Sequence, residues 1–218
     1  MGHRAGRRVG HDVRERNVSP GPATRALTPS QTVGPFFHDC LLRTDATCDT
    51  LAGDDASGQR IHVRGRVLDG DGKPVPDAVL ELWQADDHGV YHHPSDPRWI
   101  RPTSFSGFGR VGTDEDGRFA FTSVLPGRVP GHGDELQAPH ISIAVFARGL
   151  LNHLFTRMYF PDEPSNDTDP TLLCVPAHRR PTLIARATLP ADGAIGARVF
   201  RFDIVLQGSN ETVFFAIA

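Results

Sequence analysis

The chain has 218 residues, 39% of them apolar, and a formal net charge of −3 at pH 7, which suits one globular domain able to bury its own core. The slightly acidic balance gives no sign of nucleic-acid binding, and no apolar run approaches the roughly 18 residues needed to span a bilayer. Three scattered cysteines, Cys40, Cys48 and Cys174, suit neither a disulfide framework nor a thiolate metal cage. We therefore expect a reduced, cytoplasmic protein that binds neither nucleic acid nor membrane.

The first 27 residues differ in composition from the rest of the chain. They contain six arginines, two acids, several Gly and Pro, and almost nothing apolar to bury. Such a segment predicts a disordered basic extension, and a role as an RNA-binding or membrane-binding arm stays open. Residues 28–37 (TPSQTVGPFF) follow with two prolines and a glycine, which predicts an ordered arm rather than a helix or strand. The globular domain is expected over 28–218.

The pattern typical of strands begins at residue 61. In 61–67 apolar residues alternate with His and Arg, and an Asp-Gly-Asp-Gly turn follows at 69–72, which predicts a half-buried antiparallel strand. In 79–84, Leu80 and Leu82 share one face while Glu81 and Trp83 share the other. A short helix is expected within 35–50.

Two further turns are expected at 114–117 and 207–210. The first predicts a hairpin leading into a strand with Phe119 and Phe121, and the second joins predicted strands at 199–206 and 212–217. Short strands separated by Gly, Pro and Asp turns, without a long segment of helical period, indicate an all-β sandwich with antiparallel strands and long loops.

Residues 140–148 form the most informative predicted strand. Ile141, Ile143, Val145 and Ala147 make one apolar row, whereas the opposite row carries polar side chains, including those at 140, 142 and 148. One face is therefore core and the other is free for chemistry. The preceding loop, 126–133, is rich in Gly and Pro and is predicted to lie irregularly over one end of the strand, as a possible wall of a site.

Taken without a family in view, the candidate catalytic residues are weak. Five histidines are candidates for a metal site because imidazole is a common ligand, but no HxH or HxxxH pair among them shares a face with a carboxylate. Serine lacks the G-x-S-x-G setting of a hydrolase nucleophile. Arg148, just beyond an apolar strand, is either a surface cation or an anchor for an anionic ligand. The histidines are His88, His92, His93, His132 and His140.

Several segments resemble the intradiol ring-cleavage dioxygenases, and in particular the α-subunit family of protocatechuate 3,4-dioxygenase. The resemblance covers nearly everything after Leu27 and implies a β-sandwich. It also implies a reaction in which a non-haem Fe(III), held by two Tyr and two His, opens a catechol ring between its hydroxyls. The segments are TPSQTVGPFF (28–37), GKPVPDAVLELWQAD (72–86), SFSGFGRVGTDEDGRFAF (104–121), APHISIAVFARG (138–149), LLNHLFTRMYFPDE (150–163), RRPTLIA (179–185) and RFDIVLQGSNETVFF (201–215).

The metal ligands implied by the resemblance are only half present. Tyr91 fits the first tyrosine and His140 the first histidine of an H-I-H motif. Val129 replaces the tyrosine of a P-G-x-Y-P motif, and Ser142 replaces the second histidine. Gln137 stands where catalytic members carry an arginine. Because valine cannot donate to iron and a serine hydroxyl is a poor substitute for imidazole, this chain is expected to bind no metal and to have no catalytic residues, with Tyr91 and His140 as remnants.

The resemblance implies that this chain assembles with an iron-bearing β subunit and lines that subunit's substrate pocket. The residues carried over are Thr32, Gly34, Pro35, Phe36 and Arg148, with Phe36 where relatives often carry tyrosine. The complex would convert protocatechuate and O₂ to 3-carboxy-cis,cis-muconate, with Fe(III) in the β subunit and none in this chain.

Two alternatives stay open on the sequence. The first is a self-sufficient metal-dependent dioxygenase that rebuilds a site from Tyr91, His140 and a loop histidine such as His132; the second is a non-enzymatic β-sandwich binding module. Within a straight strand His140 and Arg148 lie roughly 26 Å apart. Arg148 is therefore expected to serve a partner's site and not the remnant one.

Overall fold

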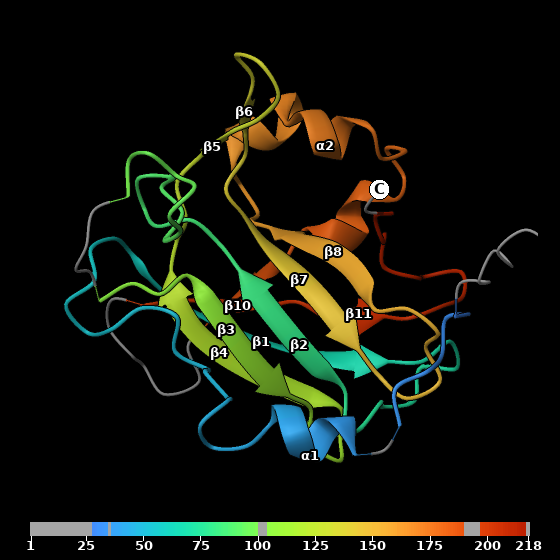
Figure 1. Ribbon diagram of the computed structural model, residues 1–218. Coiled ribbons are helices and arrows are strands. Elements are labelled where there is room, and N and C mark those ends of the chain that lie inside the picture. The colour runs from blue at the N-terminus through green and yellow to red at the C-terminus, as the bar shows by residue number, and fades with distance from the viewer. Residues whose placement is uncertain (1–27, 35, 100–103, 190–196, 217–218) are drawn as a thin grey trace, which may run out of the picture.

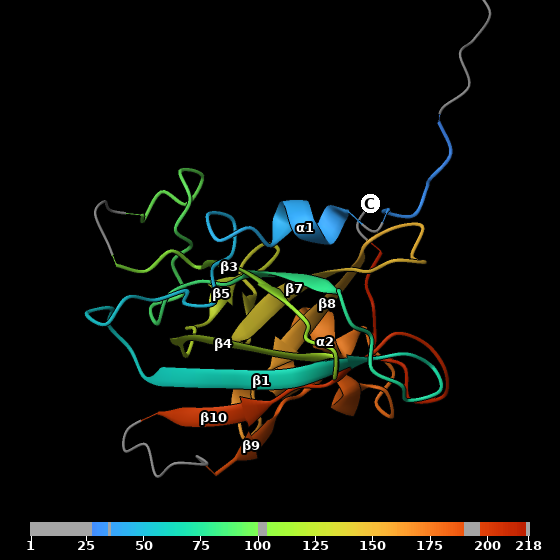
Figure 2. The same ribbon diagram turned by 90° about the horizontal axis from the view of Figure 1, so that it is seen from below.

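Two β-sheets pack face to face in the structure, a computed structural model that describes residues 28–34, 36–99, 104–189 and 197–216. Figure 2 shows the sheets as two layers, with β1, β10 and β9 on one side and β3, β7 and β8 on the other. The predicted β-sandwich is confirmed. The disordered extension predicted for residues 1–27 lies outside the described residues.

The first sheet has four strands, all antiparallel, and is seen across its face in Figure 1. Buried and partly exposed residues alternate along β3 and along most of β2 and β7, as expected for a sheet with one face on the core, and less regularly along β8. In sheet order the strands are β3 (Phe108–Gly112), β2 (Val79–Trp83), β7 (His140–Phe146) and β8 (Leu154–Tyr159).

The second sheet is mixed. Its central strand β1 pairs antiparallel with β4, and along its other edge pairs parallel with β10 and then with β11. The predicted sandwich is therefore not antiparallel throughout. The strands are β1 (Arg60–Leu68), β4 (Arg118–Val124), β9 (Arg186–Thr188), β10 (Arg198–Arg201) and β11 (Ile204–Val205).

The core lies between the two sheets and is built from the rows that the alternation predicted. The apolar row of β7 is at most 1% exposed, and it meets the inward rows of β1, β2 and β4 in one cluster. Each such side chain contributes about 1.5 to 3 kcal/mol relative to an exposed one, so burial of this row fixes which face of β7 points outward. Its outward face carries residues 140, 142, 144 and 146.

Two predicted hairpins are not formed as expected. The 114–117 turn is present, but the strands that it joins, β3 and β4, belong to different sheets, because β3 pairs with β2 and β4 pairs with β1. The predicted strand 199–206 is divided into β10 and β11. Residues 212–216 form no strand: the Thr212 hydroxyl accepts from Val205 N in place of a backbone carbonyl, and the chain then crosses to bond Phe155 on β8.

Short elements close the ends of the sandwich. Helix α1 (Phe37–Leu41), within the predicted 35–50, lies on the outer face of the first sheet in Figure 2, where Leu42 packs over Gly112 of β3. At the end where β7 begins, a two-stranded ribbon forms within and beyond the loop that was predicted to be irregular. The remaining elements are β5 (Val129–Pro130), β6 (Leu136–Gln137), η1 (Pro164–Thr168), α2 (Pro170–Leu173) and η2 (Arg180–Leu183). Among the described residues no helix has the length and apolarity to cross a membrane.

Candidate functional site

The outward face of β7 begins with His140 and Ser142, the positions of the H-I-H motif. His140 is 4% exposed and pairs with Tyr159 on β8, and their rings lie 5.7 Å apart. Ser142 stands between Trp83 on β2 and Arg157 on β8, its register partners on either side. Because residues in register share a face, Arg157 projects beside the position where the motif would place a second imidazole.

Tyr91 reaches the same face from the turn that follows β2. Gly89 makes this possible: its φ is +73°, and a Cβ there would lie 1.9 Å from the carbonyl oxygen of Arg128, so only glycine lets the two loops touch. The Tyr91 ring stacks on Trp83 at 5.9 Å between centroids and 5° between planes, and its backbone N–H donates to Asp96. Tyr91 is thereby joined to the Trp83–Ser142–Arg157 row.

The two substituted positions on the ribbon lie opposite each other. Val129 of β5 pairs with Gln137 of β6, and Val129 is buried, so an apolar side chain stands where the family motif has a phenol. The side-chain oxygen of Gln137 accepts a 2.6 Å hydrogen bond from Arg157. The structure therefore brings the sequence-predicted remnants into one neighbourhood, with the Arg157 guanidinium among them.

Arg157 belongs to a polar network that the sequence analysis did not identify. Its Nη1 also donates to Thr171 at 3.2 Å and to the Tyr159 hydroxyl at 3.4 Å, and Tyr159 in turn donates to Asp169 at 3.1 Å. Asp169 is fully buried and accepts from Ala138 N and from Leu172 N, both at 2.7 Å, which caps helix α2. The carboxylate thus links helix α2 to the start of β7.

The electrostatics of this neighbourhood keep both remnant ligands neutral. Burial, and then the charge of Arg157, lower the pKa of His140 to about 4, while its Nδ1 pairs with the Ala138 carbonyl at 2.8 Å. Burial raises the pKa of Tyr91, with the charge of Arg157 acting in the opposite direction. The charge of Arg157 therefore acts on both Tyr91 and His140.

This donor set does not suit a ferric ion. Fe(III) requires anionic oxygen and imidazole donors, whereas the four ligand positions of the family hold here one neutral phenol, one imidazole, a valine and a serine hydroxyl, and the Arg157 guanidinium lies beside them. A cation beside the two remaining donors further disfavours a bound metal ion. No reaction step can be derived for a metal in this chain.

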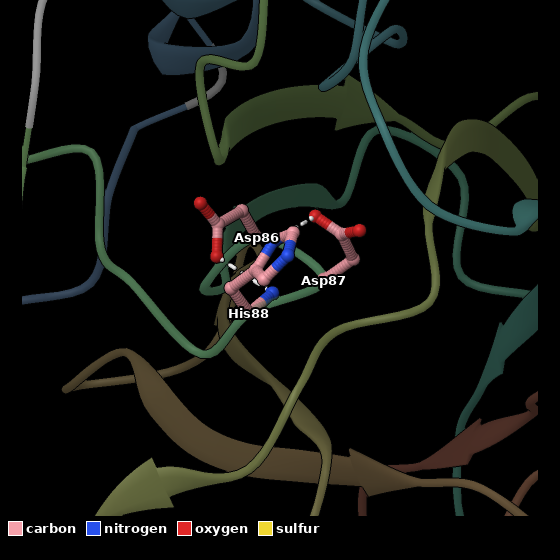
Figure 3. A group of neighbouring side chains, drawn as sticks. All are labelled: Asp86, Asp87 and His88. Carbon is pink, nitrogen blue, oxygen red and sulfur yellow. Dashed lines mark hydrogen bonds and ion pairs between the residues drawn. The ribbon is translucent and has the colours of Figure 1, made fainter.

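The candidate histidines do not form an alternative metal site. His88 contacts Asp87, His92 packs against Trp99, and His93 packs against Trp83. In the described part of the chain, the one group of three metal-type donors within reach of one another is Asp86, Asp87 and His88, which Figure 3 shows. The Asp86 carboxylate already accepts from the backbone N–H groups of His88 and Val90 in the turn, and the Asp87 carboxylate accepts from the Ser57 hydroxyl and contacts His88, so these groups are explained by structural hydrogen bonds.

The other end of β7 holds two of the residues predicted to face a partner. Arg148 lies just beyond the strand, its side chain is 54% exposed, and its Nε pairs with Asp77 at 2.5 Å. The hydroxyl of Thr32, from the arm, accepts a 2.8 Å hydrogen bond from Gly149 N. The arm is thus fastened next to Arg148. Gly34 is exposed two residues further along, and Pro35 lies outside the described residues.

Apolar side chains line a groove near this end of β7, which is open to solvent at Arg148. A groove of about 150 Å³ runs between the arm and the loop after β7, and its apolar lining includes Val33, Phe146 and Leu150. Phe36 is 74% exposed and Leu151 is 62% exposed. The end of the arm and the loop after β7 thus each present an exposed large apolar side chain, as is common on a surface that a partner covers.

The sequence analysis did not identify three residues of this polar network: Arg157, Tyr159 and Asp169. Arg157 had a signal, because it is the one charged residue in LFTRMYF, 154–160, an otherwise apolar strand. Asp169 precedes Pro170 and an apolar pair, an N-cap pattern that predicts a helix start but not a link to β7. The link depends on long-range packing, which local pattern does not reveal.

Comparison with known proteins places this geometry in a family. The family model described as "Dioxygenase" matches residues 33–208. The protocatechuate 3,4-dioxygenase alpha chain of Burkholderia cepacia is 42% identical over 204 residues, which cover 89% of this chain and 99% of that one. The beta chain from the same organism is 35% identical over 192 residues, covering 84% of this chain and 77% of the relative. The solved dioxygenase domain from Streptomyces sp. SirexAA-E is 29% identical, with a TM-score of 0.57, and covers 84% of this chain and 99% of that domain.

The chain belongs to the intradiol dioxygenase family. Within the family it is similar over nearly its whole length to protocatechuate 3,4-dioxygenase alpha chains, and the resemblance seen in the sequence is confirmed. A beta chain is also a homologue, so both kinds of subunit share this ancestry.

Proposed function

We propose that this chain is the iron-free α subunit of a protocatechuate 3,4-dioxygenase. It assembles with a β subunit that carries Fe(III), and the complex cleaves protocatechuate with O₂ to 3-carboxy-cis,cis-muconate. The chain contributes binding groups and no metal. Its identity to alpha chains over most of its length supports the subunit assignment, and the unsuitable donor set around His140 supports the absence of a metal.

One observation carries the substrate role: Thr32 and Arg148 meet at the open end of β7. The arm is held there by the hydrogen bond from Gly149 N to Thr32, and the Arg148 guanidinium is exposed beside it. Protocatechuate bears a carboxylate that catechol lacks. An arginine presented to the partner's pocket recognises that carboxylate by a charge-assisted hydrogen bond, which contributes about 1.5 to 3 kcal/mol.

The test of this role is Arg148→Ala in the assembled αβ complex. KM for protocatechuate should rise roughly 10- to 150-fold, at 1.4 kcal/mol per tenfold, while KM for unsubstituted catechol changes much less. A matched control is Arg118→Ala, which removes an ion-paired arginine of similar exposure, 51%, from the other sheet. Equal loss with both substrates would show that Arg148 does not read the carboxylate. No loss with either would make it a surface cation.

The metal assignment has its own test. The full-length chain, purified without β, should hold no stoichiometric iron and should not cleave the ring, since only Tyr91 and His140 remain as donors. The measurements are metal content and the tyrosinate-to-iron charge-transfer absorption. About one ferric ion per chain, with that absorption, would instead support a self-sufficient enzyme.

Association separates the proposal from a binding module. A permanent subunit buries a large apolar surface, over roughly 2,000 Å² per pair, so the chain expressed alone should self-associate and should become a defined complex when β is added. Indifference to β would favour a module that acts without it. We also propose that residues 1–27 are a dispensable extension, and trimming them should leave assembly unchanged.

A further inference from the structure

The site around Tyr91, His140 and Ser142 contains a positive charge, that of Arg157, although two of the metal ligands of the family are absent. In register, Arg157 stands next to Ser142, and its Nη1 bonds Gln137 across the outward face of β7. Gln137 stands where the family resemblance places an arginine. A cation from β8 therefore meets a neutral amide at the position from which the expected cation is missing.

The surroundings of Arg157 show that its charge is compensated from within the chain. Its Nη1 donates to the Gln137 carboxamide, the Thr171 hydroxyl and the Tyr159 hydroxyl, and Tyr159 connects it to the fully buried Asp169. Hydrogen-bonded compensation of this kind is what a partly buried charge needs. The guanidinium is thus a built part of the site rather than a side chain that entered a gap.

We propose that Arg157 is the internal cation of this site and takes the electrostatic place of a metal ion among Tyr91, His140 and Ser142. The site then lacks metal for two separate reasons. Two donors are missing, and a fixed positive charge stands beside the two that remain. This inference concerns the chain's own interior and holds whether or not the proposed β-subunit role is correct.

The test restores the donors while varying the charge. Full-length chains carrying Val129→Tyr and Ser142→His are prepared with Arg, Lys, Gln or Met at position 157. Each is checked for a native-like circular dichroism spectrum and then titrated with Fe(III), by metal content and tyrosinate charge-transfer absorption. The chains with Gln or Met should bind about one ferric ion, at least roughly 100-fold more tightly than the chains with Arg or Lys. Equal binding by all four, or binding by none of those that fold, would overturn the proposal.

A second measurement uses the native donors and does not depend on metal. The free energy of unfolding is compared for Arg157→Gln, for Gln137→Arg, and for the reciprocal pair Gln137→Arg with Arg157→Gln. If the site requires one cation irrespective of the strand that supplies it, the pair should recover at least half of the stability that Arg157→Gln loses. Additive losses in the pair would show that Arg157 acts only through its individual hydrogen bonds and would contradict the proposal.

Discussion

The polar side chains at the two ends of β7 differ in exposure and in hydrogen bonding. At its start, His140 is 4% exposed, and Arg157, Tyr159 and Asp169 satisfy one another by hydrogen bonds within the chain. Just past its end, Arg148 is 54% exposed and shares the surface with exposed apolar side chains. We call the start of β7, at His140, its closed end, because the polar groups there are buried and bonded within the chain. We call the other end, at Arg148, its open end, because the cation there is exposed.

This difference distinguishes polar groups that stabilise the fold from polar groups that are free to bind a ligand or a partner. At the closed end every strong polar group of the network has a partner that belongs to the same chain, so its contribution is to stability and to the placement of α2. At the open end the one partner of the cation is Asp77 among the contacts that the structure describes, and the pair is exposed, where such pairs contribute little. The remaining interaction capacity there is available to a ligand or another subunit.

The largest expected effect is at the closed end, for Asp169→Ala. The substitution leaves the N–H groups of Ala138 and Leu172 and the Tyr159 hydroxyl without their acceptor in a fully buried place. Each unsatisfied buried donor costs about 1 to 3 kcal/mol, so the free energy of unfolding should fall by about 3 to 5 kcal/mol.

Urea unfolding at pH 7 measures this effect, and Asp167→Ala is the control, because that exposed carboxylate should matter by less than about 0.5 kcal/mol. Similar losses in the two variants would mean that the closed end is not the rigid interior described here.

The next effect comes from His140 and depends on pH. Its pKa is lowered from 6.5 to about 4 by burial and by Arg157 on β8, against weaker opposite effects of the Ala138 carbonyl and of Asp169. The unfolded chain therefore takes up this proton more readily, and stability is lost as pH falls from about 6.5 toward 4. Between pH 7 and pH 4.5 the loss due to His140 should be on the order of 2 to 3 kcal/mol.

His140→Gln removes that contribution. The unfolding free energy of the variant should fall less between pH 7 and pH 4.5 than that of the parent, by the same 2 to 3 kcal/mol. Because other groups titrate in both proteins alike, the comparison isolates His140. A parallel pH dependence in the two proteins would show that the imidazole is not buried in its neutral form.

The sequence predicted what local alternation determines. The faces of β2 and β7, the short helix and the turn at 114–117 all follow from patterns within a few residues, and each was found. It did not predict sheet membership. Whether β4 pairs with β3 or with β1 is decided by long-range packing, and so are the parallel pairs of β1 with β10 and β11.

The residues of the candidate site also differ in whether local sequence or long-range packing determines them. The family motifs located Tyr91, Val129, His140 and Ser142, and the structure joins them through register and ring stacking. Arg157 was missed because no motif of the metal site includes it: its place is set by pairing between β7 and β8. The loss of metal ligands can therefore be seen in the motifs, whereas the presence of Arg157 beside their positions can be seen only in the three-dimensional structure.

The smallest expected effect concerns Asp77, the partner of Arg148 at the open end. Asp77 has φ of +61°, which asparagine also tolerates, so Asp77→Asn removes the negative charge without straining the backbone. An exposed ion pair contributes about 0.2 to 1 kcal/mol, and the stability of the chain should change by no more than that. In the αβ complex, however, the substrate carboxylate no longer has to compete with Asp77 for Arg148. KM for protocatechuate should therefore fall about 2- to 5-fold, with KM for catechol unchanged.

The control is Asp116→Asn, which removes the partner of Arg118 in the same way on the other sheet and should alter neither KM. A rise in KM for protocatechuate would mean that Asp77 orients Arg148 toward the pocket instead of competing for it, and the open end would then be as internally organised as the closed one.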